Sequence, residues 1–253
     1  MIWIELRKAI QSRLPLWTGA ASFFMPFGMA FLIFVARNPE ISARLGLISA
    51  KANLLAYAAT DWPAYLRLQS QVIAAGGFFF SVLAIAWVFG REFADGTLKD
   101  MLAVPVSRSR IVLAKFGVAV VWSAVTTVVV LVAGLVVGAL LRLPGGSAVS
   151  IFEGVLAVGI AAGLAIVTVL PFALFASIGR GYLLPLGMAV LSVMAANLVA
   201  LLGWGEYFPW AVPLLFAMGK EALPPMSFAI VLLTGVLGVV ATDLWWTYAD
   251  QNR

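Results

Sequence analysis

The sequence contains no cysteine and no histidine among its 253 residues. Without cysteine, disulfide bonds, thiolate nucleophiles and thiolate metal ligands are excluded. Without histidine, the chain lacks the commonest general base and the commonest metal ligand of proteins. Most hydrolase and metalloenzyme classes therefore do not fit this sequence.

Charged residues are also scarce, at 11% of the chain, whereas 63% of the residues are hydrophobic. This composition leaves too little polar surface to cover a water-soluble globule, so it indicates an integral membrane protein. The net charge of +5 could suggest nucleic acid as a partner. The basic residues lie beside apolar segments, however, where orientation in the membrane explains them better, so no nucleic-acid partner is expected.

Six segments are long and apolar enough to cross a bilayer, which takes about 20 residues per helix. We therefore expect one all-α membrane domain over residues 1–253, with spans at about 16–36, 72–90, 111–141, 152–178, 182–203 and 226–246. Pro26 predicts a kink in the first span. Residues 37–71 are expected to form a polar loop with short surface helices, one of them beginning at Asp61-Trp62-Pro63.

Residues 1–15 have the pattern of an amphipathic helix that lies in the membrane interface. One face carries Ile2, Leu6, Ile10 and Leu14, and the opposite face carries Glu5, Arg7, Lys8, Gln11 and Ser12. A signal peptide is the alternative, because it also combines a basic start with an apolar run.

The distribution of charge predicts the orientation in the cell membrane. With the N-terminus inside, the cytoplasmic segments hold ten Lys and Arg residues, against six outside. Short cytoplasmic loops are enriched in Lys and Arg, so both termini are expected to be cytoplasmic.

Residues 91–115 form the only long internal segment that is dense in charge. Arg91 to Met101 can form a short helix, which Pro105 would end because proline lacks an amide proton. Ser107 is a candidate N-cap for the third span. The segment would then lie as a helix and a turn across the cytoplasmic face, although the same charges would suit an ordinary cytoplasmic loop.

The order of residues in this connector adds a specific resemblance. The run contains Glu92, Gly96-Thr97-Leu98, Leu102, Pro105, Ser107-Arg108 and Lys115, at spacings that resemble the permease subunits of ABC-2 type ATP-binding-cassette exporters, also called type V exporters. The start Glu5-Leu6-Arg7-Lys8 is similar to the branch of bacitracin and lantibiotic immunity permeases.

This resemblance implies that the connector contains a coupling helix that docks on a separate ATPase subunit. The residues implied in coupling are Glu92, Asp95, Gly96, Thr97, Leu98, Leu102, Pro105, Arg108 and Lys115. The chain has no G-x-x-x-x-G-K-[ST] motif, so ATP and Mg²⁺ would belong to the partner, and this chain would be a transport subunit and not an enzyme. A homodimer, or a pair with a similar permease, would enclose a path among membrane lipids and export or extract an amphipathic substrate, such as an antibiotic or antimicrobial peptide.

Two other classes of membrane protein are alternatives to a permease. A sensor or assembly factor could use the connector only to bind a cytoplasmic partner, and an intramembrane enzyme would need a cluster of polar residues at one depth, which the sequence does not show. Two G-x-x-x-G pairs, Gly134 with Gly138 and Gly159 with Gly163, are predicted to pack inside the subunit. Glu153 is predicted to be a solvated surface charge, and Asp243 an interfacial or interhelical partner.

Overall fold

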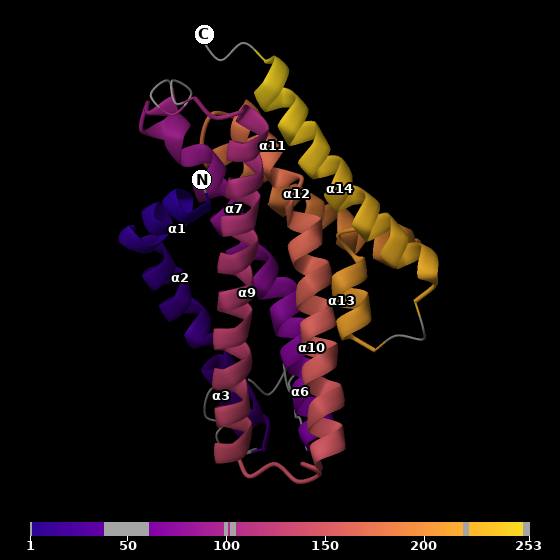
Figure 1. Cartoon of the computed structure of the whole chain (residues 1–253). Coiled ribbons are helices and arrows are strands. Elements are labelled where there is room, and N and C mark those ends of the chain that lie inside the picture. Colours follow the sequence, from indigo (N-terminus) through magenta and orange to yellow (C-terminus); the bar gives the residue numbers. More distant parts are fainter. Residues whose placement is uncertain (1, 38–60, 99–100, 102–104, 220–222, 250–253) are drawn as a thin grey trace.

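The computed structural model describes residues 2–37, 61–98, 101, 105–219 and 223–249, and all regular elements in these ranges are helical (Figure 1). Within this part of the chain, six helical segments are long and apolar enough to cross a membrane. The expected all-α architecture with six spans is therefore confirmed.

The described elements follow one another along the chain in this order. They are α1 (Ile2–Gln11), α2 (Leu14–Phe23), α3 (Met25–Arg37), α6 (Trp62–Val72), the π-helix η1 (Ile73–Gly77), α7 (Phe78–Ala94), α9 (Arg108–Leu140), α10 (Ala148–Val169), α11 (Phe172–Ile178), α12 (Leu183–Leu201), the 3₁₀ turn η2 (Gly205–Tyr207), α13 (Val212–Ala217) and α14 (Pro225–Tyr248).

Two spans are kinked next to a proline. Between α2 and α3, Phe24 keeps a right-handed helical backbone, so the first span bends before Pro26 but does not end there. Between α10 and α11, Leu170 and Pro171 keep helical backbone angles in the same way. A proline ring removes one hydrogen bond and crowds the preceding turn, which bends a helix without ending it when its neighbours support it.

The second span is longer than predicted, which corrects the expected boundary at residue 72. α6, η1 and α7 form one path from Trp62 to Ala94, and the Asp61 side chain caps its start by accepting a hydrogen bond from the Ala64 amide (2.9 Å). Residues 62–71 are thus part of a span and not of a surface loop. The rest of the predicted loop, residues 38–60, lies outside the described residues.

The polar residues for which a loop was expected here form hydrogen bonds to a neighbouring helix. The Gln69 side chain is fully buried and donates to the Val130 carbonyl on α9 (2.9 Å), and the Tyr65 hydroxyl donates to the Gly134 carbonyl (2.9 Å). Buried polar groups that donate in this way add interhelical hydrogen bonds and do not force the segment into water, although Gln69 Oε1 accepts no hydrogen bond from the described residues.

The helix α9 is the structural centre and packs against α1, α2, α3, α7, α10 and α14. Its Gly134 lies so close to Gln69, and its Gly138 so close to Trp62, that a side chain at either position would collide, which confirms the predicted internal packing. The prediction for Gly159 and Gly163 on α10 is wrong, because a Cβ at either position would meet nothing within 4 Å.

The segment between α12 and α14 enters the helix bundle as a short wedge. Ala211, Val212 and Pro213 are buried, and α13 packs against α6, η1 and α10. The Trp210 indole donates to the Thr168 carbonyl at the kink of the fourth span (3.0 Å). These contacts agree with the re-entrant arrangement that prolines and aromatic residues favour at this position.

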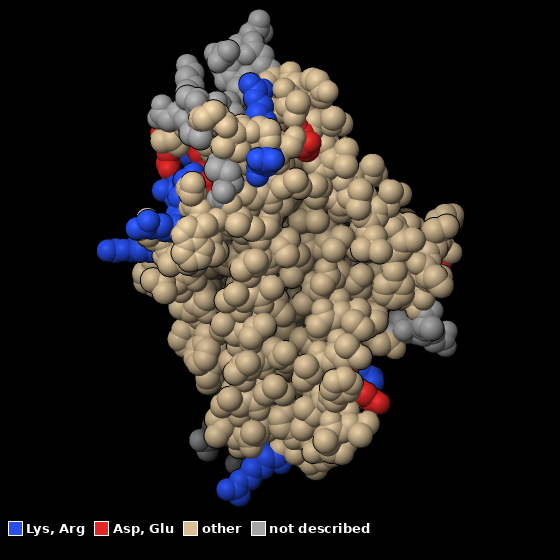
Figure 2. All heavy atoms as spheres, in the orientation of Figure 1, with Lys and Arg blue, Asp and Glu red and all other residues tan. Residues whose placement is uncertain are grey.

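Figure 2 shows Lys, Arg, Asp and Glu gathered toward the two ends of the molecule, with a broad belt of other residues between them. Large apolar side chains are exposed over this belt, for example Trp17, Val125, Leu191 and Leu233. A water-soluble protein would bury such residues, whereas the hydrocarbon of a bilayer accommodates them.

Candidate coupling site

The connector begins where α7 ends, one turn beyond the apolar part of the second span. Asp95 is the C-terminal flanking residue of α7 and binds Arg91 through a side-chain ion pair (3.1 Å), and Gly96 has a left-handed backbone (φ 70°). A left-handed glycine at this position ends a helix at little steric cost. The predicted single helix over residues 91–101 is therefore corrected: residues 91–94 belong to α7, and the chain turns at Asp95–Gly96.

Beyond this turn, the connector is fastened to the bundle by its apolar residues. Leu98 and Met101 are buried in the main core, and the Met101 amide donates to the Thr97 carbonyl (3.2 Å), which is the mark of one helical turn. Asp95, Gly96 and Thr97 are exposed. The connector thus presents a small polar tip on an anchored base, while Leu102 lies outside the described residues.

Beneath the connector, four charged side chains form an ion cluster, in which Glu5, Glu92 and Lys115 are buried and Lys8 is partly exposed; we call it the buried ion cluster. The Lys115 ammonium is completely buried on α9 and donates to Glu92 Oε1 on α7 (2.7 Å), to Glu5 Oε2 on α1 (3.3 Å) and to the Val88 carbonyl (2.8 Å). Lys8 Nζ lies 2.7 Å from Glu5 Oε1 and 3.5 Å from Glu92 Oε1. Two positive and two negative charges therefore balance one another at the junction of three helices.

The environment of Glu5 shows how this balance works. Burial alone would raise the pKa of its carboxyl, but the ammonium groups of Lys115 and Lys8 together hold the pKa below its ordinary value. Glu5 therefore remains ionised and attached to α9. The amphipathic helix α1 is confirmed, but its polar face is not wholly turned to water, because Glu5 faces the core while Ile2, Trp3 and Ile10 are exposed.

At the other end of the connector, the start of α9 is tied to the end of α14. Pro105 and Ser107 are exposed, and Ser107 occupies the N-cap position of α9 without a side-chain cap bond. Arg108 donates to the carbonyls of Trp246 and Thr247 (3.0 and 3.2 Å), which lie in the last turn of α14, where carbonyls have no partner within the helix. Ser109 donates to Asp243 (3.2 Å), so this aspartate is an interhelical partner.

The structure thus separates the nine predicted coupling residues into groups with different surroundings. Glu92 and Lys115 are internal and cannot touch a soluble partner, and Arg108 is engaged with α14. Among the predicted coupling residues that the structure describes, Asp95, Gly96, Thr97 and Pro105 are exposed and can present a surface. The internal residues instead connect that surface to α1, α9 and α14, so a force on the tip would reach three other helices.

Sequence reasoning did not place Glu5 and Lys8 in this site. The sequence does contain a signal for these two residues. A lysine inside an apolar helix, such as Lys115, requires a carboxylate partner, and Glu5 on the amphipathic helix is a carboxylate that requires a cation. The separation of 110 residues between Glu5 and Lys115 hid this pairing.

Comparison with known proteins gives two matches. The family described as ABC-2 family transporter protein matches residues 1–196. The bacitracin transport permease protein BCRB of Bacillus licheniformis is 27% identical over 168 residues, which cover 65% of this chain and 81% of that protein. No solved structure gives a significant match.

Proposed function

Because the chain belongs to the ABC-2 family of transporter proteins, we propose that it is a permease subunit that couples ATP hydrolysis by a separate subunit to export of an amphipathic substrate. The family membership and the six apolar spans support a multi-pass transport subunit. The ATPase partner would bind ATP and Mg²⁺, since this sequence has no P-loop. A second copy of the chain, or a similar permease, would complete the transport path.

One observation carries this proposal, which is that the connector has an exposed polar tip on a base that is packed in the core of the bundle. Leu98 and Met101 fix the base in the core, and the buried ion cluster and Arg108 fix the helices on either side. A soluble partner that displaces the tip would therefore shift whole helices, as in rigid-body transitions of packed helices.

The orientation that we propose places the connector in the cytoplasm with both termini on the same side. Figure 1 shows the described start of α1, the end of α14 and the connector at one end of the molecule. The basic side chains at this end include Arg7, Lys8, Arg13, Arg91, Arg108, Arg110, Lys115 and Arg180. This excess is what the positive-inside rule predicts for a cytoplasmic face.

An apolar cavity supports the amphipathic nature of the substrate. A space of about 480 Å³ lies between η1, α7, α12 and α13, and its walls are mainly small or apolar residues such as Ala74, Phe78 and Ala196. Asn197 is a polar group on this wall, and its amide donates to the Val193 carbonyl of its own helix (2.8 Å). Such a space suits the apolar part of an amphipathic compound, and bacitracin, for which the permease of Bacillus licheniformis is named, is one such compound.

The experiment that tests this function isolates the chain from its native host and measures both the proteins that accompany it and their ATPase activity. We expect a P-loop protein and an ATPase activity that Thr97→Arg, at the exposed tip, reduces at least about tenfold. The control Ala148→Arg places the same side chain at the exposed start of α10, at the opposite end, and should have no effect. The absence of any ATPase, or an equal effect of both variants, contradicts the proposal.

A further inference from the structure

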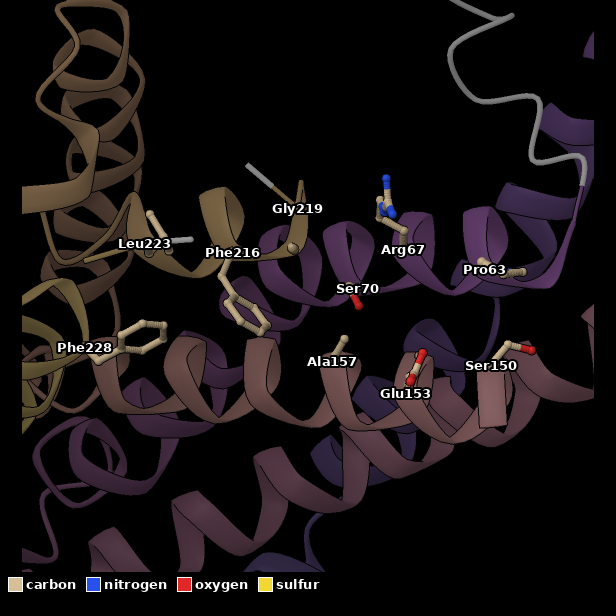
Figure 3. A pocket seen from close by; sticks show the side chains of 12 residues that line it. Pro63, Arg67, Ser70, Ser150, Glu153, Ala157, Phe216, Gly219, Leu223 and Phe228 are labelled. Carbon is tan, nitrogen blue, oxygen red and sulfur yellow. The ribbon is translucent and has the colours of Figure 1, made fainter. Parts of the chain in front are cut away.

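A second pocket, of about 540 Å³, opens between α6, α10, α13 and α14 and takes no part in the proposed coupling (Figure 3). One side of its lining is polar and contains Arg67, Ser70, Ser150 and Glu153, and the other side is apolar and contains Ala157, Phe216, Leu223 and Phe228. Figure 3 shows Pro63, Ser150 and Glu153 toward one end of the pocket, and Phe216 of α13 and Phe228 of α14 toward the other.

The depth of the polar side follows from the continuous second span. Arg67 precedes Arg91 by 24 residues along α6, η1 and α7. At the α-helical rise of 1.5 Å per residue this path is at most about 36 Å long, and the π-helix η1 shortens it slightly, so it still matches the hydrocarbon thickness of about 30 Å. When Arg91 lies at one membrane surface, Arg67 therefore lies at the headgroup level of the other.

The apolar side reaches toward the middle of the bilayer. Phe216 and Phe228 form an aromatic pair (ring centroids 6.2 Å apart) and pack in the same cluster as Leu164, which is three turns deeper along α10 than Glu153. The pocket is thus polar at the headgroup level and apolar below it. This is the same order as in a phospholipid that stands in the leaflet.

The polar groups of the pocket have free bonding capacity. Ser70 is only 1% exposed, and its hydroxyl, which lines the pocket and points into it in Figure 3, has no hydrogen-bond partner within the described part of the chain. Across the same described residues, neither Arg67 nor Glu153 takes part in an ion pair. A buried hydroxyl without a partner costs free energy unless a ligand or water supplies one.

We propose that this pocket binds a zwitterionic phospholipid with a phosphoethanolamine headgroup. The planar guanidinium of Arg67 matches the geometry of a phosphate, and the Glu153 carboxylate accepts hydrogen bonds from the primary ammonium. The Ser70 hydroxyl donates to a phosphate or ester oxygen, and Phe216 and Phe228 line the path of an acyl chain. Phosphocholine offers no N–H donor to Glu153, and phosphoglycerol lacks a cation. The site requires no transport, so it goes beyond the proposed function.

The test measures binding of lipids of known composition to the purified, delipidated chain by native mass spectrometry. We expect phosphatidylethanolamine to bind at least about fivefold more tightly than phosphatidylglycerol, with phosphatidylcholine between them. Arg67→Gln should weaken all three. Glu153→Gln should remove the preference by raising the binding of phosphatidylglycerol, because the repelling carboxylate is gone. Free phosphoethanolamine, which has no acyl chains, should displace phosphatidylethanolamine only weakly, because the apolar side of the pocket contributes to binding of the whole lipid.

Matched controls and a stability measurement keep the result interpretable. Arg142→Gln and Glu206→Gln change the same residue types outside the pocket and should leave lipid binding unchanged. Ser70→Ala should lower phosphatidylethanolamine binding about threefold while the melting temperature in lipid-free detergent stays equal or rises, because an unpartnered hydroxyl is removed. Equal binding of the three lipids by the wild type, or equal losses in the control variants, would overturn the proposal.

Discussion

Replacement of Lys115 by methionine should destabilise the protein strongly, although methionine has a similar length and suits an apolar helix. The wild-type ammonium is fully buried and uses its donors on Glu5, Glu92 and the Val88 carbonyl. Its removal leaves two buried carboxylates that share only the half-exposed Lys8. Loss of one partner from a buried ion pair costs about 3–5 kcal/mol.

Thermal unfolding in detergent, followed by intrinsic tryptophan fluorescence, measures this effect. For a chain of this size, about 3–5 kcal/mol corresponds to a decrease of roughly 6–20 °C in the melting temperature. Glu92→Gln in the Lys115→Met background should recover part of the loss, because it removes a carboxylate that has lost its partner. The control Arg110→Gln, on the exposed side of the same helix, should change the melting temperature little.

The reasoning is refuted if Lys115→Met melts at the same temperature as Arg110→Gln. It is also refuted if the double variant is as unstable as the sum of its two single variants, because the cluster predicts strong coupling between residues in contact.

Three further predictions concern packing, helix ends and pH. Gly134→Val should lower the melting temperature by several degrees, because a Cβ there would collide with Gln69, whereas Gly159→Val should be tolerated in open space. Arg108→Gln should speed amide hydrogen exchange in the last turn of α14, since two carbonyls lose a charged donor. The pKa of Glu5 is lower in the folded state than in the unfolded state, where it is about 4.5. The ionised carboxylate therefore contributes its full stabilisation above pH 4.5, and this contribution is lost as the pH falls through the folded-state pKa. Glu5→Gln should therefore make the free energy of unfolding less dependent on pH in the acid range.

The spans and the class of the protein could be predicted from the sequence because a membrane helix is defined by local hydrophobicity. The start of the second span could not, because Tyr65 and Gln69 are polar, and only the facing backbone of α9 makes them suitable for the interior. Whether each of the two glycine pairs packs closely likewise depends on the neighbouring helix. Gly134 faces α6, whereas Gly159 faces open space, and spacing along one helix carries no information on this difference.

The sequence predicts the connector as a charged segment between two spans, because charge density is a local feature. It does not predict the turn at Asp95–Gly96, and the part of the nine residues in coupling stays a prediction. The buried ion cluster joins Glu5 to residues 87 and 110 positions away, Glu92 and Lys115, and only the packing of α1 on α9 brings these groups together. The burial of Glu92 and Lys115 then follows from their mutual pairing, which charge density alone does not reveal.

The measurement that tests the central claim most directly uses the absence of cysteine from the natural chain. Asp95→Cys places a single thiol at the exposed tip of the connector, and Ala148→Cys places one at the opposite end. We predict that Asp95→Cys cross-links to a P-loop ATPase and is protected from an impermeant reagent added outside intact cells, whereas Ala148→Cys is labelled from outside and gives no such cross-link. External labelling of Asp95→Cys, or an ATPase cross-link from Ala148→Cys alone, would contradict the account.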